Sequence, residues 1–250
     1  MERYGLIGKP LGHSFSQKYF TEKFQRENID ALYAPYQLDS AEEILNVVRQ
    51  QENVCGLNVT IPYKKDVIQF LDAMDDEARA IGAVNVVAVR RDATGRMTLI
   101  GHNSDVNGFT NSIKPLLKPS DRKALILGTG GASKAVVYGL EKKLGLEVKF
   151  VSRHPQEGQL RYEDLDEALM SEYHVIVNAT PLGMFPKVDE CPDIPYQFLT
   201  PDHVCFDLVY NPLETLFLKK AAQQGARVKN GLEMLHLQAD ESWEFWQKNK

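Results

Sequence analysis

Short apolar runs alternate along the chain with segments whose apolar residues recur at helical spacing. In the first hundred residues the runs at 3–7, 32–38, 56–59 and 83–89 predict strands, and residues 16–28 predict a helix. Ser40 followed by Glu43 forms a capping box, which predicts the start of another helix. Residues 91–95 predict a turn into a hairpin strand at 97–100. This alternation is typical of an α/β protein with mostly parallel strands.

A second series of elements begins at Lys123. Apolar runs at 124–127, 147–151, 175–177, 204–206 and 227–229 predict strands, with helices from a glycine turn to about 143 and around 215–224, ending at Gly225. After Asn230 and Gly231 the spacing predicts one final helix, which is too short to fold alone and is expected to pack on the first half. We therefore expect two three-layer α/β domains with a cleft between them. Residues 1–101 with 231–250 form the first, and residues 102–230 form the second.

Composition and charge restrict the class of function. The 250 residues are 43% hydrophobic and 25% charged, and 29 Lys and Arg against 34 Asp and Glu give a net charge of -5 without a long run of one sign. No basic nucleic-acid surface is expected, so a small-molecule partner is favoured. No stretch approaches the ~20 apolar residues of a membrane span, the N-terminus lacks the apolar core of a signal peptide, and Cys55, Cys191 and Cys205 are widely spaced. We expect a cytoplasmic protein without a membrane partner, either a monomer or a homodimer.

The strongest local motif is a glycine turn between a predicted strand and a predicted helix. It consists of Gly128, Thr129, Gly130, Gly131 and Ala132, followed by Ser133 where a dinucleotide fingerprint usually has its third glycine. Glycines allow the backbone to turn tightly and to approach a pyrophosphate, whose charge the helix N-terminus stabilises. The alternative is a simple tight connection, but the strand–turn–helix context favours a nucleotide.

The end of the next predicted strand indicates which nucleotide binds. Ser152 and Arg153 stand there, and no Asp or Glu is present to accept a hydrogen bond from a ribose 2′-hydroxyl. Arg153 can instead pair with a 2′-phosphate, so NADP is favoured over NAD, unless Arg153 is only a surface arginine. The six histidines form no HxxxH pair or His–Cys cluster, and no metal site is expected.

Polar residues also cluster at predicted element ends in the first half. Ser14 and Ser16 precede a helix and could hold a carboxylate, although the local pattern alone favours a cap at Ser16. Asn58, Thr60 and Lys64 stand at or just after the end of a predicted strand, where ligands of parallel sheets bind.

Lys64 and Asp105 are the candidate proton-transfer groups. An amine near an apolar pocket has a lowered pKa and can exchange a proton with an alcohol or carbonyl, whereas the simpler alternative is a solvated lysine beside Lys65. Asp105, which follows Asn85 and Ser104 along the chain, could position Lys64 and share its proton. Its alternative role, or that of Ser104, is to cap a helix that extends toward Leu117.

Taken together, these motifs resemble the shikimate dehydrogenase family over nearly the whole chain. Six blocks occur in that family's order: Gly12-His13-Ser14-Phe15-Ser16, Gly56-Leu57-Asn58-Val59-Thr60-Ile61-Pro62-Tyr63-Lys64, Gly82-Ala83-Val84-Asn85, Gly101-His102-Asn103-Ser104-Asp105, Gly128-Thr129-Gly130-Gly131-Ala132 and Asn178-Ala179-Thr180-Pro181-Leu182-Gly183-Met184. The chain departs from the family pattern at Gln17, at Ser104 and at Ser152-Arg153-His154, where the family usually has Pro, Thr and Asn-Arg-Thr or Asn-Arg-Ser.

The resemblance implies an NADP-dependent oxidoreductase that reversibly reduces 3-dehydroshikimate to shikimate, on the route to chorismate and the aromatic amino acids. It implies a substrate domain first and a Rossmann NADP domain second, with Lys64 as the acid/base, hydrogen-bonded with Asp105. The implied substrate-binding residues are Ser14, Ser16, Asn58, Thr60, Asn85, Tyr210 and Gln238. The implied NADP-binding residues are Gly128, Thr129, Gly130, Gly131, Ala132, Ser152, Arg153, Thr180, Leu182, Met184 and Gly231.

Three other functions remain open from the sequence. A quinate/shikimate dehydrogenase with relaxed use of NAD and NADP would fit Ser152 and His154. A catalytically silent nucleotide or metabolite sensor could share the fold, because a fold alone does not establish chemistry. A folate-linked methylene dehydrogenase of similar build would not need Ser14 and Ser16.

Overall fold

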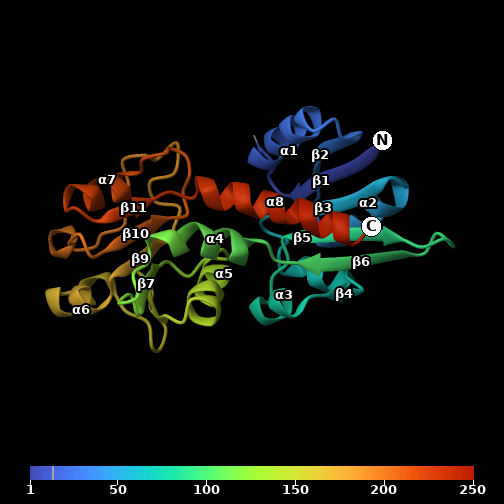
Figure 1. Ribbon diagram of the computed structural model, residues 1–250. Coiled ribbons are helices and arrows are strands. Elements are labelled where there is room, and N and C mark those ends of the chain that lie inside the picture. The colour runs from blue at the N-terminus through green and yellow to red at the C-terminus, as the bar shows by residue number, and fades with distance from the viewer. Residues whose placement is uncertain (13) are drawn as a thin grey trace. The chain divides into compact units, whose positions relative to one another are not determined.

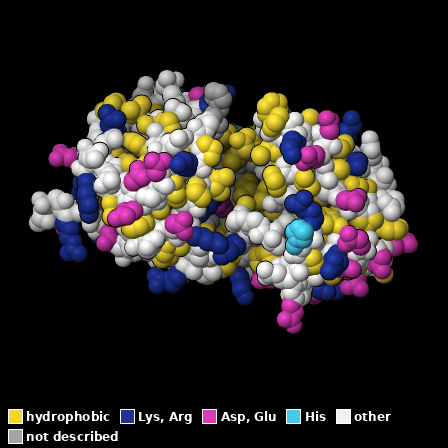
Figure 2. Space-filling view, turned by 180° about the vertical axis from the view of Figure 1, so that it is seen from behind, with side chains coloured by type: hydrophobic (Ala, Val, Ile, Leu, Met, Phe, Trp, Pro, Cys, Tyr) yellow, Lys and Arg dark blue, Asp and Glu magenta, His cyan; other side chains and the backbone are white. Residues whose placement is uncertain are grey.

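The computed structural model describes residues 1–12 and 14–250, so His13 of the first motif lies outside the described residues. The chain divides into two compact units: Met1–Ser104 with Gln238–Lys250 (unit 1), and Asp105–Leu237 (unit 2). The boundaries predicted from the sequence, after residue 101 and before residue 231, lie a few residues earlier in the chain. Acidic and basic side chains both occur among apolar ones on the face that Figure 2 shows. Among the described residues, no helix is long and apolar enough to cross a membrane.

Unit 1 is built on a six-stranded mixed sheet with the order β2-β1-β3-β5-β6-β4 (Figure 1). β1, β2 and β3 are parallel, whereas β5 runs antiparallel to both β3 and β6. The strands are β1 Glu2–Gly8, β2 Ala31–Gln37, β3 Val54–Val59, β4 Ala73–Met74, β5 Val86–Arg91 and β6 Met97–His102. Because β5 is antiparallel to β3, it begins beside the end of β3 and brings Asn85 next to Asn58.

Helices cover both faces of this sheet. They are α1 Phe15–Arg26, α2 Ile44–Gln50, α3 Asp76–Ile81 and the greater part of α8 Leu232–Lys248. Phe20 and Phe24 of α1 and Trp246 of α8 pack on one face with Tyr4 and Tyr33. The other face contacts α2. Gly56 lies so close to Trp246 that a Cβ would stand 2.4 Å from the indole, so only glycine fits there.

Unit 2 contains a five-stranded parallel sheet with the order β11-β10-β9-β7-β8. Its strands are β7 Lys123–Leu127, β8 Glu147–Val151, β9 Val175–Asn178, β10 Val204–Asp207 and β11 Arg227–Lys229. From β7 the sheet is extended to one side by β8 and to the other side by β9, β10 and β11. The strand order therefore reverses between β7 and β9, and this is the switch point at which doubly wound folds bind ligands. The α-helices that lie wholly within this unit are, among the described residues, α4 Asp105–Ile113, α5 Ser133–Tyr138, which a π-helical turn continues through Gly139–Lys143, α6 Glu167–Glu172 and α7 Leu216–Gln223.

Two core clusters make this second unit three-layered. Phe109 of α4 and Val136 of α5 pack on one face, and Met170 of α6 and Phe217 of α7 pack on the other. Thr215 caps α7, and Gly225 follows this helix with a φ of +84°. The two-domain α/β fold expected from the sequence is confirmed.

Some boundaries differ from the predictions. Helix α1 begins at Phe15, so Ser14 is its N-cap and Ser16 lies in the first turn; the prediction of a cap at Ser16 was wrong. The strand expected at 83–89 begins only at Val86. The capping box at Ser40 is present, and the Glu43 carboxylate accepts a hydrogen bond from the Ser40 amide at 3.0 Å.

Candidate active site

The candidate cofactor residues of unit 2 follow the carboxyl ends of its strands. Gly128 comes directly after β7 with a φ of +96°, and its amide donates to the Val151 carbonyl at the end of β8. A Cβ on Gly128 would lie 2.7 Å from Cγ2 of Thr180, whereas Gly131 has open space around it. The turn therefore requires glycine at 128 and leaves the backbone beyond it accessible, as a phosphate group needs.

Ser152 and Arg153 follow β8, the strand beside β7. The Ser152 hydroxyl accepts from the amide of His154 at 3.2 Å, and the Arg153 side chain is exposed. Burial raises the pKa of Tyr162, and the positive charge of Arg153 acts in the opposite direction, so the guanidinium lies within electrostatic reach of Tyr162. Arg153 is thus available to an anion at this edge of the sheet.

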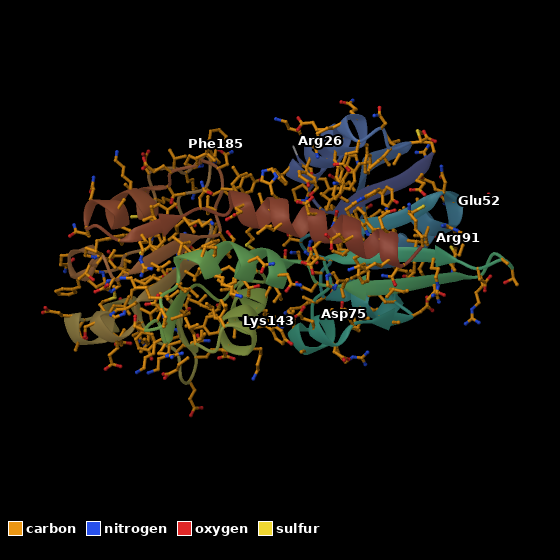
Figure 3. All side chains as sticks on the ribbon, viewed as in Figure 1. Arg26, Glu52, Asp75, Arg91, Lys143 and Phe185 are labelled. Carbon is orange, nitrogen blue, oxygen red and sulfur yellow. The ribbon has the colours of Figure 1, made fainter. Side chains whose placement is uncertain are left out.

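Asn178, the last residue of β9, holds the loop that follows it. Its side-chain oxygen accepts from the amide and the hydroxyl of Thr180, at 3.0 and 2.6 Å. The Thr180 hydroxyl in turn accepts from the amide of Leu182. Met184 is 47% exposed, and Phe185, labelled in Figure 3, is also exposed. The loop is fixed at its base and presents apolar side chains at its end.

Asp207, at the end of β10, helps to hold the loop that follows β9. Its carboxylate accepts from Asn178 at 3.0 Å and from the Thr215 hydroxyl at 2.6 Å, and burial raises its pKa to about 6. Tyr210, three residues later, is half-buried. Gly231 approaches the segment after β10 so closely that a Cβ would lie 2.3 Å from the Leu208 carbonyl oxygen, so no larger residue fits there.

The candidate substrate residues other than Tyr210 belong to unit 1, and most of them lie where α1, β3 and β5 begin or end. Ser14 accepts from the amide of Gln17 as the cap of α1. Thr60 follows β3, and its amide donates to the Ile7 carbonyl at 2.9 Å. Lys64 is half-buried, and its carbonyl accepts from the Val84 amide at 2.7 Å. The backbone that carries these side chains is therefore held by neighbouring segments.

Asn85 and Ser104 form a buried pair. The side-chain oxygen of Asn85 accepts from the Ser104 amide at 2.8 Å, and its Nδ2 donates to the Ser104 hydroxyl at 3.1 Å. Asp105, which comes next, is 7% exposed and is the first residue of α4. Lys64 belongs to unit 1 and Asp105 to unit 2.

Two residues that the sequence analysis missed join these side chains. Tyr33 donates to the side-chain oxygen of Asn58 at 2.8 Å, and the Ser242 hydroxyl accepts from Nδ2 of Asn58 at 3.0 Å. Ser242 also donates to the Gln238 carbonyl at 2.7 Å. Its position four residues after Gln238 places both on one face of a helix, which was the available signal. Tyr33 gave no such signal, because its spacing is that of a core strand residue.

A second polar cluster of unit 1 surrounds His102, the last residue of β6. Its Nε2 lies 2.9 Å from the Glu241 carboxylate, and its Nδ1 contacts the carboxylate of Asp75, which caps α3 and is labelled in Figure 3. The ring stacks on Phe245 with a centroid distance of 4.6 Å. Burial alone would lower the pKa of His102, but the two carboxylates raise it to about 9. His102 is therefore a buried cation at neutral pH.

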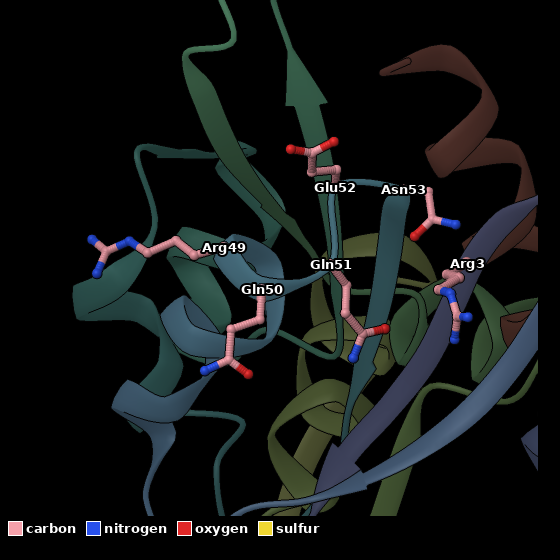
Figure 4. A pocket seen from close by; sticks show the side chains of 6 residues that line it. All are labelled: Arg3, Arg49, Gln50, Gln51, Glu52 and Asn53. Carbon is pink, nitrogen blue, oxygen red and sulfur yellow. The ribbon is translucent and has the colours of Figure 1, made fainter.

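A separate polar hollow lies at the other end of the same sheet. It is lined by Arg3, Arg49, Gln50, Gln51, Glu52 and Asn53 (Figure 4). Asn53 immediately precedes β3, so the hollow lies at the amino end of that strand, whereas Asn58 and Thr60 mark its carboxyl end. Arg3 and Arg49 point in different directions in Figure 4 and do not converge on one point.

Comparisons with known proteins agree with this geometry. A glycine turn at the switch point of a doubly wound sheet, in a chain that also has a second α/β unit with its own polar cluster, is typical of the nicotinamide-dependent dehydrogenases. Residues 6–87 match the shikimate dehydrogenase substrate binding domain. The chain is 39% identical to the NADP⁺ shikimate dehydrogenase of Carboxydothermus hydrogenoformans, over 97% of this chain and 90% of that protein. The chain therefore belongs to the shikimate dehydrogenase family.

Solved structures give the same result. Shikimate 5-dehydrogenase from Thermus thermophilus, in complex with NADP(H) and shikimate, superposes with a TM-score of 0.84 at 31% identity, over 99% of this chain and 94% of that one. Quinate dehydrogenase from Corynebacterium glutamicum, in complex with NAD, superposes with a TM-score of 0.86 at 26% identity, again over 99% and 94%.

Proposed function

We propose that this chain is an NADP-dependent shikimate dehydrogenase that reversibly reduces 3-dehydroshikimate to shikimate. Membership of the family supports the reaction class. The observation that carries the proposal is the connected set of polar groups in unit 1, in which the side chains of Asn58 and Asn85 and the backbone carbonyl of Gln238 are linked through Ser242 and Ser104. A polyhydroxylated ring needs several hydrogen-bonding groups in fixed positions, and this set provides them.

The residues present in unit 2 fit NADP. Gly128 leaves no room for a Cβ at the turn, and the backbone that follows is open at Gly131. In the proposal Gly128, Thr129, Gly130, Gly131 and Ala132 hold the pyrophosphate. Ser152 and Arg153 hold the 2′-phosphate, and Thr180, Leu182, Met184 and Gly231 line the ribose and nicotinamide.

Unit 1 would bind the substrate. Ser14 and Ser16 hold its carboxylate, Asn58, Thr60, Asn85 and Gln238 contact the ring hydroxyls, and Asp105 and Tyr210 add contacts from the residues of unit 2. Ser14 can donate its hydroxyl proton to a carboxylate while its oxygen continues to cap α1, because the cap uses the oxygen only as an acceptor.

Lys64 would be the acid/base, with Asp105 as its catalytic partner. The bound reduced cofactor supplies a hydride to the substrate's carbonyl carbon. The ammonium group of Lys64 stabilises the negative charge that develops on the carbonyl oxygen and donates a proton to it. In the reverse direction the neutral amine accepts the hydroxyl proton.

We also propose a cytoplasmic location and a small-molecule substrate, for a protein that acts as a monomer or a homodimer. The three cysteines are unpaired with one another, which is compatible with a reducing compartment.

The activity itself can be tested directly. Purified protein mixed with shikimate and NADP is expected to increase absorbance at the band of the reduced nicotinamide. A protein that binds NADP but leaves the absorbance unchanged would instead be a sensor on this fold.

Replacement of Arg153 tests the cofactor assignment. Arg153→Ala is expected to lower kcat/KM for NADP about 10–100-fold and to leave that for NAD nearly unchanged, because a charge-assisted bond to the 2′-phosphate is lost. Steady-state kinetics with both cofactors measure this. Arg122→Ala is the matched control, since Arg122 is exposed at the amino end of β7, opposite the cofactor residues. An equal loss with both cofactors would remove Arg153 from this role.

The second candidate is a quinate/shikimate dehydrogenase that also uses NAD. The similarity to the Corynebacterium glutamicum quinate dehydrogenase in complex with NAD favours testing it. Kinetics with quinate and shikimate, each with NAD and NADP, separate the two candidates. A kcat/KM for quinate with NAD equal to that for shikimate with NADP would select the second.

A further inference from the structure

The Asn58 side chain is held on two sides by other side chains of unit 1. The Tyr33 hydroxyl donates to its Oδ1 at 2.8 Å. Its Nδ2 donates to the Ser242 hydroxyl at 3.0 Å and to the backbone carbonyl of Asn85 at 3.3 Å. These three bonds come from β2, α8 and the segment before β5, so they fix the amide relative to three separate elements.

The orientation of this amide is determined by chemistry. A backbone carbonyl can only accept, so the end of Asn58 that faces the Asn85 carbonyl must be its NH₂ group. Oδ1 then faces Tyr33, which must donate. Tyr33 is 2% exposed, and burial raises its pKa, with a hydrogen bond from Ser16 acting in the opposite direction. The phenol therefore stays protonated and remains a donor at working pH.

Ser242 is fixed in the complementary sense. It is 1% exposed, and its hydroxyl proton goes to the Gln238 carbonyl at 2.7 Å, as expected for a serine bonded to the preceding turn. Its oxygen is left to accept from Asn58. The Ser104 hydroxyl lies 3.4 Å away and accepts from Asn85, so Ser242 stands between the two amides.

These bonds use both N–H protons of Asn58 and one of the two lone pairs on Oδ1. We infer that Tyr33 and Ser242 are positioning residues that make Asn58 a hydrogen-bond acceptor only, so that the site selects a ring hydroxyl able to donate. The inference rests on the proposed function, in which Asn58 contacts a ring hydroxyl. A group at that ring position without a proton to donate, such as fluorine or an ether, would face the remaining lone pair of Asn58 Oδ1 and could not form a hydrogen bond with it.

Fluorinated shikimates provide the probe, with each ring hydroxyl replaced in turn except the one that is oxidised, because a fluorinated carbon cannot become the carbonyl. For the shikimate fluorinated at the position that Asn58 contacts, the wild-type enzyme is expected to show a kcat/KM about 10–100-fold below that for shikimate, because one buried hydrogen bond is lost and an acceptor is left unpaired. In Tyr33→Phe the ratio of kcat/KM for shikimate to kcat/KM for the fluorinated shikimate is expected to fall about fivefold, the effect of one hydrogen bond, because Asn58 is no longer fixed. KM for shikimate rises, and kcat and KM for NADP change little.

Tyr36→Phe is the matched control. Tyr36 lies on the same strand and donates its hydroxyl to an amide oxygen, that of Gln51, at 3.0 Å, but Gln51 has no place in the proposed site. The control should leave the shikimate-to-fluoroshikimate ratio at the wild-type value. If circular dichroism shows that Tyr33→Phe does not fold, the same ratio is measured in Ser242→Ala, which removes the other side chain that holds Asn58.

The outcomes separate this inference from the proposed function. A ratio that stays unchanged in both Tyr33→Phe and Ser242→Ala would overturn the inference while shikimate turnover persists. Equal kcat/KM values of the wild type for shikimate and for every fluorinated shikimate that keeps the reacting hydroxyl would also overturn it. Absence of any shikimate turnover by the wild type would overturn the proposed function and the inference together.

Discussion

Lys64→Ala is expected to lower kcat about 10²–10⁴-fold, the usual contribution of a general acid or base, while shikimate still binds. The variant removes the group that would donate a proton to the carbonyl oxygen, and it leaves the carboxylate and hydroxyl contacts in place. Steady-state kinetics at saturating shikimate and NADP give kcat. Equilibrium dialysis with shikimate gives the affinity.

The backbone at Lys64 does not depend on its side chain. Its carbonyl accepts from Val84, and the neighbouring Tyr63 is buried with its hydroxyl bonded to the Leu38 carbonyl at 2.7 Å. Loss of activity would therefore not be loss of fold. Lys65→Ala is the matched control, because Lys65 is the adjacent exposed lysine and has no proposed role. Near wild-type turnover in Lys64→Ala would rule out the assignment.

The free energy of unfolding of unit 1 is expected to fall by about 3 kcal/mol as the pH rises from about 6.5 to above 9. The cause is His102, whose pKa is raised in the folded state to about 9 from a usual 6.5. A group with a raised pKa contributes its full stability below the unfolded pKa and loses it as the pH passes the folded one. Above that point His102 is neutral, and Asp75 and Glu241 face each other across it without a cation.

Tryptophan fluorescence during urea unfolding measures this effect selectively. Both tryptophans, Trp243 and Trp246, belong to the part of α8 that lies in unit 1. His102→Gln is the control, since glutamine keeps hydrogen-bonding capacity without a charge that titrates. Its pH dependence should be flatter than that of the wild type by the same amount. Identical slopes in the two proteins would show that His102 is not the titrating group.

Local patterns were sufficient for most of the fold. Short apolar runs located the strands and helical spacing located the longer helices, and the glycine turn at Gly128 was recognisable because its backbone requirement is local. Short elements such as β4 and α3 were missed, since two to six residues carry too little periodicity. The cap of α1 was misplaced by two residues because Ser14 and Ser16 are both good caps.

The candidate site was only partly predictable for a different reason. Asn58 and Lys64 stand at or just after the carboxyl end of β3, where parallel sheets place ligands, and could be proposed from position alone. Tyr33 and Ser242 contact Asn58 across 25 and 184 residues of sequence, and nothing local indicates such contacts. The role of His102 likewise depends on Glu241, which lies 139 residues further along the chain.

Helix α8 has a consequence for the order in which the chain folds during synthesis. Trp246 completes the aromatic core around Tyr4 and Phe20, and Gln247 bonds Tyr4 across 243 residues. Unit 2, in contrast, is one continuous segment and emerges from the ribosome before the last thirteen residues of unit 1, Gln238–Lys250. The first hundred residues, although made earliest, keep an open aromatic core until α8 has been synthesised, so we expect this part of the nascent chain to need protection from aggregation.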